Sequence, residues 1–166
     1  RDITSLEYRE KFAATQQLPT AAIPTMLPTL NKLIRDEGGG EGLAPGYVLV
    51  VGANPGYAKT LIGLNLAASA LSHGQPVGYV SLEMSTNQIA SRYYAIQSGL
   101  PVASIERGSF NPRIWDKVQS TVQVMPPLYA PDEVSSRWED VVSFVKETHD
   151  DHGVKYYVLD YIQLCA

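Results

Sequence analysis

Apolar residues beyond position 46 form short continuous runs, and these runs alternate with stretches of helical spacing. The runs are rich in Val, Tyr and Leu, which is typical of strands buried on both faces. They predict strands at residues 47–52, 77–82, 127–130 and 155–160. The stretches between them predict helices at residues 60–72, 85–99, 112–122 and 138–148. Strands that alternate with helices indicate an α/β fold with a mostly parallel sheet, whose ligands bind at the carboxyl ends of the strands.

Polar residues mark the ends of several of these helices. Ser85 with Gln88 three residues later forms a capping-box pattern, and Ser136 with Glu139 repeats it before the last helix. Gly74 is expected to end the 60–72 helix. The last helix is expected to end at 152–153, where a histidine precedes a glycine.

The first 46 residues differ from the remainder of the chain. They carry prolines at positions 19, 24, 28 and 45 and a glycine-rich stretch at 38–42, with short helices expected at 8–14 and 29–35. We interpret 1–46 as an N-terminal arm or linker and 47–166 as the core domain.

Composition narrows the class of protein. The chain has 166 residues, of which 45% are hydrophobic and 18% charged, which suits a single domain with a real core. A net charge of −4 gives no broad basic face for nucleic acid. Cys165 is the single cysteine, so an internal disulfide or a cysteine-based zinc site is excluded.

No apolar run approaches the roughly 20 residues of a membrane span, and the N-terminal residues lack a signal-peptide core. We therefore expect a cytoplasmic protein, or one in the organellar or nucleoid equivalent of the cytoplasm, neither secreted nor membrane-bound.

The stretch GANPGYAKT at 52–60 joins the first predicted strand to its helix. A strand, a glycine-containing turn and Lys-Thr at the start of a helix are typical of a phosphate-binding loop, in which backbone N–H groups surround the phosphates. Lys59 would reach the outer phosphates and the Thr60 hydroxyl would help to hold Mg²⁺. The spacing departs from the usual motif, because Ala53 and Ala58 occupy its glycine positions. An ordinary strand, turn and helix with an exposed lysine explains this segment alone equally well.

Acidic residues follow two other predicted strands. Glu83 comes directly after the 77–82 run and could orient an attacking water, while Asp160 ends the 155–160 run and could hold Mg²⁺ through water. Either acid alone could simply cap a helix or loop. Gln163 could sense the terminal phosphate or simply face solvent. Because the carboxyl ends of parallel strands share one rim, Lys59, Glu83 and Asp160 together favour a site for a Mg-bound nucleotide.

Longer motifs carry a family resemblance. The sequence resembles the ATPase domain of the DnaB-type replicative helicases, within the RecA-like superfamily. The matching stretches keep the family's order: IPTMLPTLNKL (23–33), LAPGYVLVVGANPGYAKTLIGLNLA (43–67), PVGYVSLEMSTNQIASRYYA (76–95), PLYAPDEVSS (127–136) and HGVKYYVLDYIQL (152–164). The motifs SLEMS and DYIQL form a specific pair. They fit a replicative helicase better than a RecA-like ATPase that acts on protein or serves recombination.

The resemblance implies a fold, an activity and a set of site residues. The implied fold is a RecA-like P-loop NTPase core whose sheet is incomplete after the Walker B strand at 155–160. The implied activity is that of a motor that hydrolyses ATP with Mg²⁺, moves on single-stranded DNA as a ring of six and unwinds duplex DNA, with the DNA contacts outside this chain. By resemblance, the catalytic residues are Lys59, Glu83 and Gln163. The nucleotide-binding residues are Asn54, Pro55, Gly56, Tyr57, Ala58, Lys59 and Thr60, and the Mg²⁺ residues are Thr60 and Asp160.

Ala58 departs from the family's loop, which reads A-x-P-x-x-G-K-T. A glycine before the lysine permits a close backbone approach or a conformation that is costly for other residues. The alternative function is therefore a weakened or non-catalytic RecA-like module that serves assembly or regulation.

Overall fold

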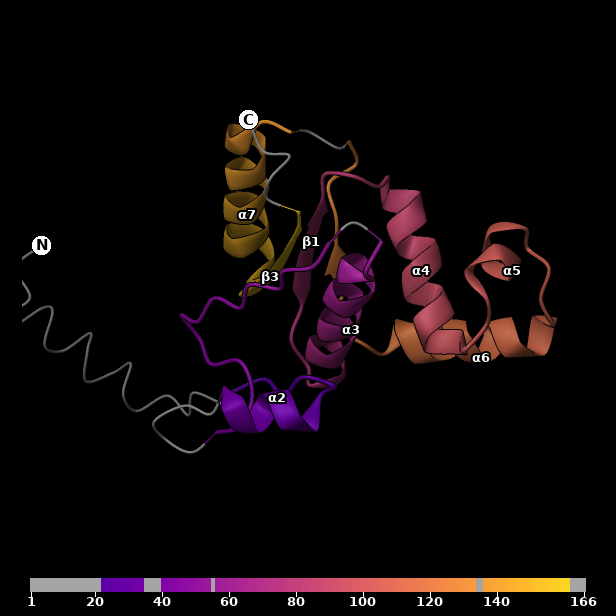
Figure 1. Ribbon diagram of the computed structural model, residues 1–166. Helices are drawn as coiled ribbons and strands as arrows, with labels where there is room; N and C mark the ends of the chain where they lie inside the picture. Colours follow the sequence, from indigo (N-terminus) through magenta and orange to yellow (C-terminus); the bar gives the residue numbers. More distant parts are fainter. Residues whose placement is uncertain (1–21, 35–39, 55, 134–135, 162–166) are drawn as a thin grey trace, which may run out of the picture.

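The computed structural model describes residues 22–34, 40–54, 56–133 and 136–161 (Figure 1). Helices and strands alternate along this part of the chain. In order they are α2 (Pro28–Leu33), α3 (Lys59–Ser72), β1 (Val77–Ser81), α4 (Thr86–Ser98), α5 (Val102–Glu106), α6 (Pro112–Gln123), β2 (Leu128–Tyr129), α7 (Trp138–His152) and β3 (Tyr156–Asp160).

The strands form a parallel sheet of three strands in the order β2-β1-β3. Val77 of β1 is aligned with Leu128 of β2 and with Tyr156 of β3, and the pairing with β3 continues to Ser81 and Asp160. Every residue of the central strand β1 is buried, as its continuous apolar run predicts. The predicted α/β class, with a parallel sheet flanked by helices, is confirmed.

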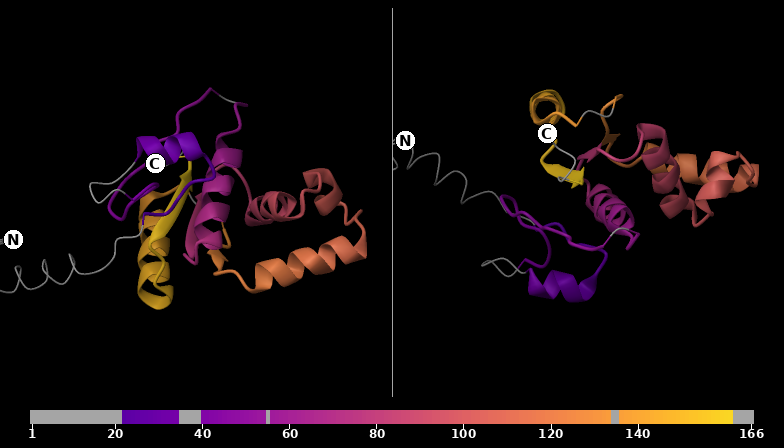
Figure 2. Two further views of the ribbon diagram at one scale, coloured as in Figure 1. Left: turned by 90° about the horizontal axis from the view of Figure 1, so that it is seen from below. Right: turned by 45° about the horizontal axis from the view of Figure 1, so that its top comes forward.

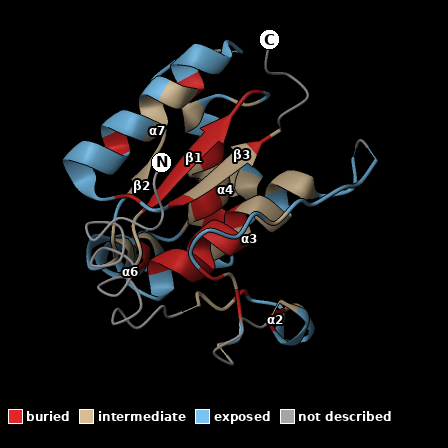
Figure 3. Cartoon of the chain, turned by 90° about the vertical axis from the view of Figure 1, so that its left-hand side faces the viewer, coloured by how far each residue is buried: buried red, intermediate tan, exposed pale blue. Residues whose placement is uncertain are grey.

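Helices cover both faces of the sheet. Helix α7 lies on one face and α3 on the other, with α4 beside α3 and α5 and α6 further from the sheet (Figures 1 and 2). Gly78 of β1 faces α7, since a Cβ there would meet the rings of Tyr157 and Phe144. On the opposite face α3 packs Leu64 and Leu71 against β1, which makes this side the most deeply buried part of the molecule (Figure 3). Leu61, at the start of the predicted stripe, is 51% exposed and does not join this core.

The helix ends test the capping predictions. The Ser85 capping box is confirmed, since the Ser85 hydroxyl accepts from the Gln88 N–H and the Gln88 side chain accepts from the Ser85 N–H. The second predicted box is wrong: α7 begins after Arg137, which makes no side-chain cap. Gly153 ends α7 in a left-handed conformation, as predicted. Helix α5 was not predicted, because five residues are too few to show a period.

The predicted strand at 47–52 is the main correction to the sequence analysis. These residues have no regular secondary structure, and Val48 and Val50 are 87% and 84% exposed. In the described part of the chain no strand pairs with them. An apolar, β-branched run fits a strand, but the strand forms only where a partner supplies the hydrogen bonds.

Residues 22–34 and 40–46 pack beside α3. Ile23 and Leu43 form an antiparallel bridge, and the Ser69 hydroxyl of α3 donates to the Pro24 carbonyl at 2.7 Å. The short helix expected at 29–35 is present as α2, whereas the one expected at 8–14 lies outside the described residues. The division between arm and core at residue 46 stays a prediction. None of the helices in the described ranges is both long and apolar enough to cross a membrane.

Candidate functional site

The loop before α3 turns sharply into the helix. The Tyr57 N–H donates to the Asn54 carbonyl at 3.2 Å, and Gly56 has a positive φ of 81°. Ala58 then adopts a left-handed conformation, with φ 57° and ψ 28°, as the residue that precedes α3. Helix α3 begins at Lys59, so its first-turn N–H groups and the positive end of its dipole face this loop.

The ammonium group of Lys59 lies inside the curve of the loop. Its Nζ donates to the Ala53 carbonyl at 3.1 Å and to the Asn54 carbonyl at 3.3 Å. The same nitrogen is 5.7 Å from the centre of the Tyr161 ring, within range of a cation–π interaction. Tyr161 follows the last residue of β3, so the lysine lies beside the carboxyl end of that strand.

Asp160 ends β3 and is 6% exposed. Its Oδ2 accepts a hydrogen bond from the Tyr79 hydroxyl at 3.2 Å, and its backbone carbonyl accepts from the Leu82 N–H at 2.8 Å. Burial raises the pKa of Tyr79 well above its ordinary value, and the charge of Asp160 and the hydrogen bond to it add to the effect. The phenol therefore stays neutral and acts as the donor.

Glu83 is exposed in the turn between β1 and α4. Because Ser81 is aligned with Asp160, the carboxyl ends of β1 and β3 meet at one edge of the sheet, and Glu83 follows Ser81 by two residues. The structure thus places Lys59 and Asp160 near the end of β3, with Glu83 following β1 at the same edge. Thr60 is half-buried as the second residue of α3. Gln163 and Pro55 lie outside the described residues, and the roles of all these side chains stay predictions.

The oxygen side chains at this edge fit Mg²⁺. Within the described ranges, no group of three or more His, Cys, Asp or Glu residues could hold a metal ion. Mg²⁺ commonly keeps several waters and takes one or two carboxylates together with substrate phosphates. The Asp160 carboxylate and the Thr60 hydroxyl are oxygen ligands of this kind, so the residues present fit a Mg-bound nucleotide.

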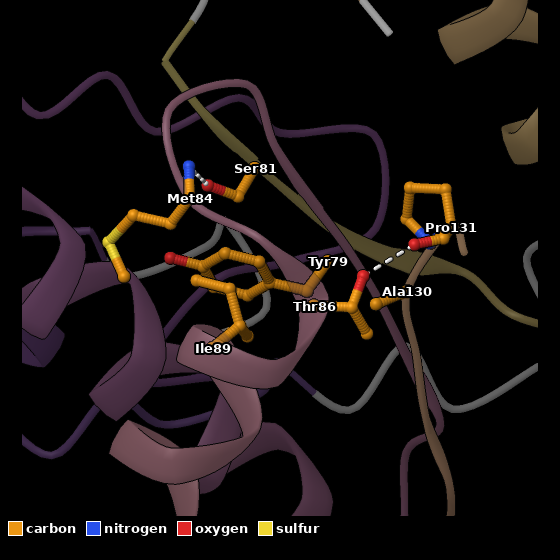
Figure 4. Close-up of a pocket in the computed structure, with 7 residues that line it drawn as sticks. All are labelled: Tyr79, Ser81, Met84, Thr86, Ile89, Ala130 and Pro131. Atoms are coloured by element: carbon orange, nitrogen blue, oxygen red, sulfur yellow. Dashed lines mark hydrogen bonds between the residues drawn. The ribbon is translucent and has the colours of Figure 1, made fainter. Parts of the chain in front are cut away.

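A small hollow opens beside β1, but its lining is uncharged. It is lined by Tyr79, Ser81, Met84, Thr86, Ile89, Ala130 and Pro131 (Figure 4). The Ser81 hydroxyl accepts from the Met84 N–H, and the Thr86 hydroxyl donates to the Pro131 carbonyl, which joins α4 to the segment after β2. This hollow offers no cation for a phosphate, so the candidate nucleotide site is the loop at Lys59.

Two tyrosines at the site were missed by the sequence analysis. Tyr79 lies within an apolar run, and its need for a hydrogen-bond partner was the available signal, since a buried tyrosine hydroxyl usually finds one. Tyr161 stands next to Asp160, and that adjacency was its signal. Neither signal names the partner. Tyr79 and Asp160 are 81 residues apart, and Tyr161 and its partner Lys59 are further apart still.

Comparison with known proteins identifies the family. The family described as the DnaB-like helicase C terminal domain matches residues 22–166, and the chain belongs to this family. The resemblance found in the sequence motifs is therefore confirmed.

Relatives of the chain include named replicative helicases. It is 28% identical over 145 residues to the replicative DNA helicase DnaB of Leifsonia xyli subsp. xyli (strain CTCB07), covering 86% of this chain and 30% of the relative. It is 26% identical over 145 residues to the replicative DNA helicase DnaB of Geobacillus stearothermophilus, covering 86% of this chain and 31% of that protein. It is 29% identical over 125 residues to a probable plasmid replicative DNA helicase of Chlamydia psittaci, covering 74% of this chain and 27% of that protein. The chain thus spans less than a third of the length of these relatives.

Proposed function

We propose that this chain binds Mg-ATP at the loop 53–60 and hydrolyses it as the motor part of a DnaB-like replicative helicase. The observation that carries the proposal is the position of Lys59. Its ammonium group is held by two loop carbonyls at the start of α3 and lies over Tyr161, directly after Asp160. A cation, a helix N-terminus and a buried carboxylate thus gather at one edge of the sheet, a combination suited to a metal-bound triphosphate.

Each side chain has a distinct task in this proposal. Lys59 exchanges its loop carbonyls for phosphate oxygens, while backbone N–H groups of the loop and of the first turn of α3 bind the remaining oxygens. Thr60 and Asp160 hold Mg²⁺, Asp160 largely through water. When bound, Mg²⁺ neutralises charge that develops on the phosphates.

Glu83 and Gln163 act on the water and the terminal phosphate. The exposed carboxylate of Glu83 accepts a hydrogen bond from a water molecule and orients its oxygen for in-line attack on the terminal phosphorus. The bond from phosphorus to the leaving ADP breaks as the bond to the water oxygen forms, and the water's proton passes to Glu83. Gln163 senses the terminal phosphate.

The action on DNA belongs to the whole protein. Membership in the DnaB-like family supports movement on single-stranded DNA by a ring of six copies. The DNA contacts lie outside this chain in the proposal, which agrees with its net charge of −4. Since the binding and turnover of ATP take place within the cell's replication machinery, we propose a cytoplasmic or nucleoid location.

A second candidate function is a weakened or non-catalytic nucleotide-binding module that serves assembly or regulation. The observation that favours it is the left-handed backbone of Ala58, at the residue before Lys59. A methyl group in that conformation strains the loop and changes how its N–H groups meet a phosphate. Replacement Ala58→Gly should raise nucleotide affinity and turnover, and unchanged values would remove the basis for a weakened site.

The test measures binding of a fluorescent ATP analogue with Mg²⁺ and ATP turnover with and without single-stranded DNA. Lys59→Ala should lower nucleotide affinity by about tenfold or more, since it removes a charged donor to the phosphates. Lys117→Ala, at an exposed position of α6, is the matched control and should bind as the wild type does.

Glu83→Gln separates the two candidate functions. In a motor it should keep nucleotide affinity and lose turnover by about 100-fold, because the amide cannot accept the proton. Binding without turnover in the wild type would support the module. Equal nucleotide affinity in the wild type and in Lys59→Ala would overturn the site itself.

A further inference from the structure

The hydroxyl of Tyr79 connects the core of the sheet to the candidate site. The Tyr79 side chain is fully buried, and its hydroxyl donates to Asp160 Oδ2 at 3.2 Å. Tyr79 is aligned with Val158 of β3, so the phenol reaches along the sheet toward its carboxyl end, where Asp160 lies. Among the described residues, the Tyr79 hydroxyl is the side-chain group that donates a hydrogen bond to the Asp160 carboxylate.

The same hydroxyl also faces α3. A Cβ at Gly63 would lie 3.1 Å from the Tyr79 hydroxyl oxygen and 3.2 Å from Val158 Cγ1, so the helix approaches the sheet as closely as a glycine allows. Gly63 follows Lys59 by four residues and therefore lies on the same side of the helix, one turn later. One hydroxyl thus occupies the contact between the helix that carries Lys59 and the carboxylate of Asp160.

We infer that Tyr79 is a positioning residue for Mg²⁺: it fixes the Asp160 carboxylate by one oxygen and sets the distance of that carboxylate from the first turn of α3. Oδ2 is engaged by the phenol, which leaves Oδ1 for the water shell of the metal. Hydrogen bonds that orient a metal-binding carboxylate typically change metal affinity by about 10–100-fold. The inference rests on the proposed function, because it requires Asp160 to act on Mg²⁺.

The experiment replaces Tyr79 with Phe in the full chain, which removes the hydroxyl and keeps the ring. The readout is the Mg²⁺ concentration that half-saturates binding of a fluorescent ATP analogue. We expect this concentration to rise about tenfold, with nucleotide affinity in EDTA unchanged. Tyr93→Phe is the matched control, because Tyr93 is a buried tyrosine of the same core whose hydroxyl meets Met125 Sδ. It should leave the Mg²⁺ requirement as in the wild type.

Asp160→Asn separates failure of this inference from failure of the proposed function. An unchanged Mg²⁺ requirement in Asp160→Asn would overturn the metal role of Asp160. A raised requirement in Asp160→Asn together with an unchanged one in a folded Tyr79→Phe would overturn the positioning role alone. The double variant should match Asp160→Asn, since the hydroxyl acts only through that carboxylate.

Gly63→Ala provides a second variant in which Tyr79 remains in place. The added methyl group would force the hydroxyl or the helix to shift by a few tenths of an ångström. We expect a smaller rise in the Mg²⁺ requirement than in Tyr79→Phe. Should Tyr79→Phe fail to fold, an unchanged requirement in folded Gly63→Ala would overturn the inference.

Discussion

Ala58 adopts a backbone conformation that its side chain disfavours. Within the described ranges it is the one residue other than glycine with a positive φ, at 57°. The left-handed region brings Cβ close to the following carbonyl and costs about 1 kcal/mol for alanine. The strain lies directly before Lys59, so it falls on the loop that we propose binds phosphate.

Replacement of Ala58 by glycine should relieve this strain. We expect the free energy of unfolding to rise by about 1 kcal/mol, because glycine adopts a positive φ without steric cost. The measurement is chemical denaturation of the wild type and the variant. Ala53→Gly is the control in the same loop, and its φ is not positive, so glycine there should leave stability unchanged or lower it by less than about 1 kcal/mol. Equal effects at both positions would contradict the strain.

The sequence pointed to Ala58 as a departure from the expected glycine, but it could not give the conformation. The spacing of the phosphate-binding loop singles out the position before the lysine, and the resemblance shows that glycine is usual at that position. The backbone angle follows from how the loop must turn to enter α3 while its carbonyls reach the Lys59 ammonium group. That path is a property of the folded loop.

The segment 47–51 is the element that most separates the sequence pattern from the structure. Its residues are apolar and β-branched, yet Tyr47, Val48 and Val50 are more than half exposed. An exposed run with strand-forming residues and no charge is prone to pair with other chains.

Polar replacements in this segment should reduce self-association. We expect the double change Val48→Ser with Val50→Ser to lower light scattering at rising protein concentration and to leave the unfolding midpoint unchanged, because neither side chain is buried. Val124→Ser is the control, since Val124 is 84% exposed as a single valine after α6. A marked loss of stability in the double variant would contradict the exposed placement and favour the strand that the sequence predicted.

Local signals predicted the other elements well. The Ser85 box and the glycines at 74, 99 and 153 mark helix ends through bonds or angles that involve only neighbouring residues. The failed cap at Ser136 shows the limit of such signals. Helix α7 begins after Arg137. Its position is set by contacts to the sheet, such as the hydrogen bond of 3.0 Å between the Thr148 and Tyr157 hydroxyls.

The whole molecule carries several buried tyrosines with raised pKa values. Burial is the first cause for Tyr79, Tyr93 and Tyr156, and the charge of Asp160 adds to it for Tyr79. A tyrosine in the unfolded chain ionises near pH 10, whereas these side chains stay neutral to higher pH in the folded chain. They therefore contribute stability that is fully present below about pH 10 and is lost as the pH rises above it.

Alkaline denaturation tests this property. The free energy of unfolding should fall between about pH 9 and about pH 11, by about 1.4 kcal/mol per pH unit above pH 10 for each tyrosine that stays neutral. Tyr79→Phe should make the fall shallower. Val124→Ser is the control and should keep the wild-type slope, since it changes an exposed position and removes no ionisable group. Identical slopes in all three proteins would contradict the burial argument.

The sequence by itself determined the class of fold, the family, most helix boundaries and the residue types of the candidate site. These follow from periodicity, capping and short motifs, each of which involves residues close together along the chain. Only the tertiary structure decided that Tyr79 bonds Asp160, that Tyr161 lies over Lys59 and that 47–51 stands outside the sheet. Such contacts join residues far apart in sequence, and the packing of helices on the sheet, which no local pattern encodes, sets which of them meet.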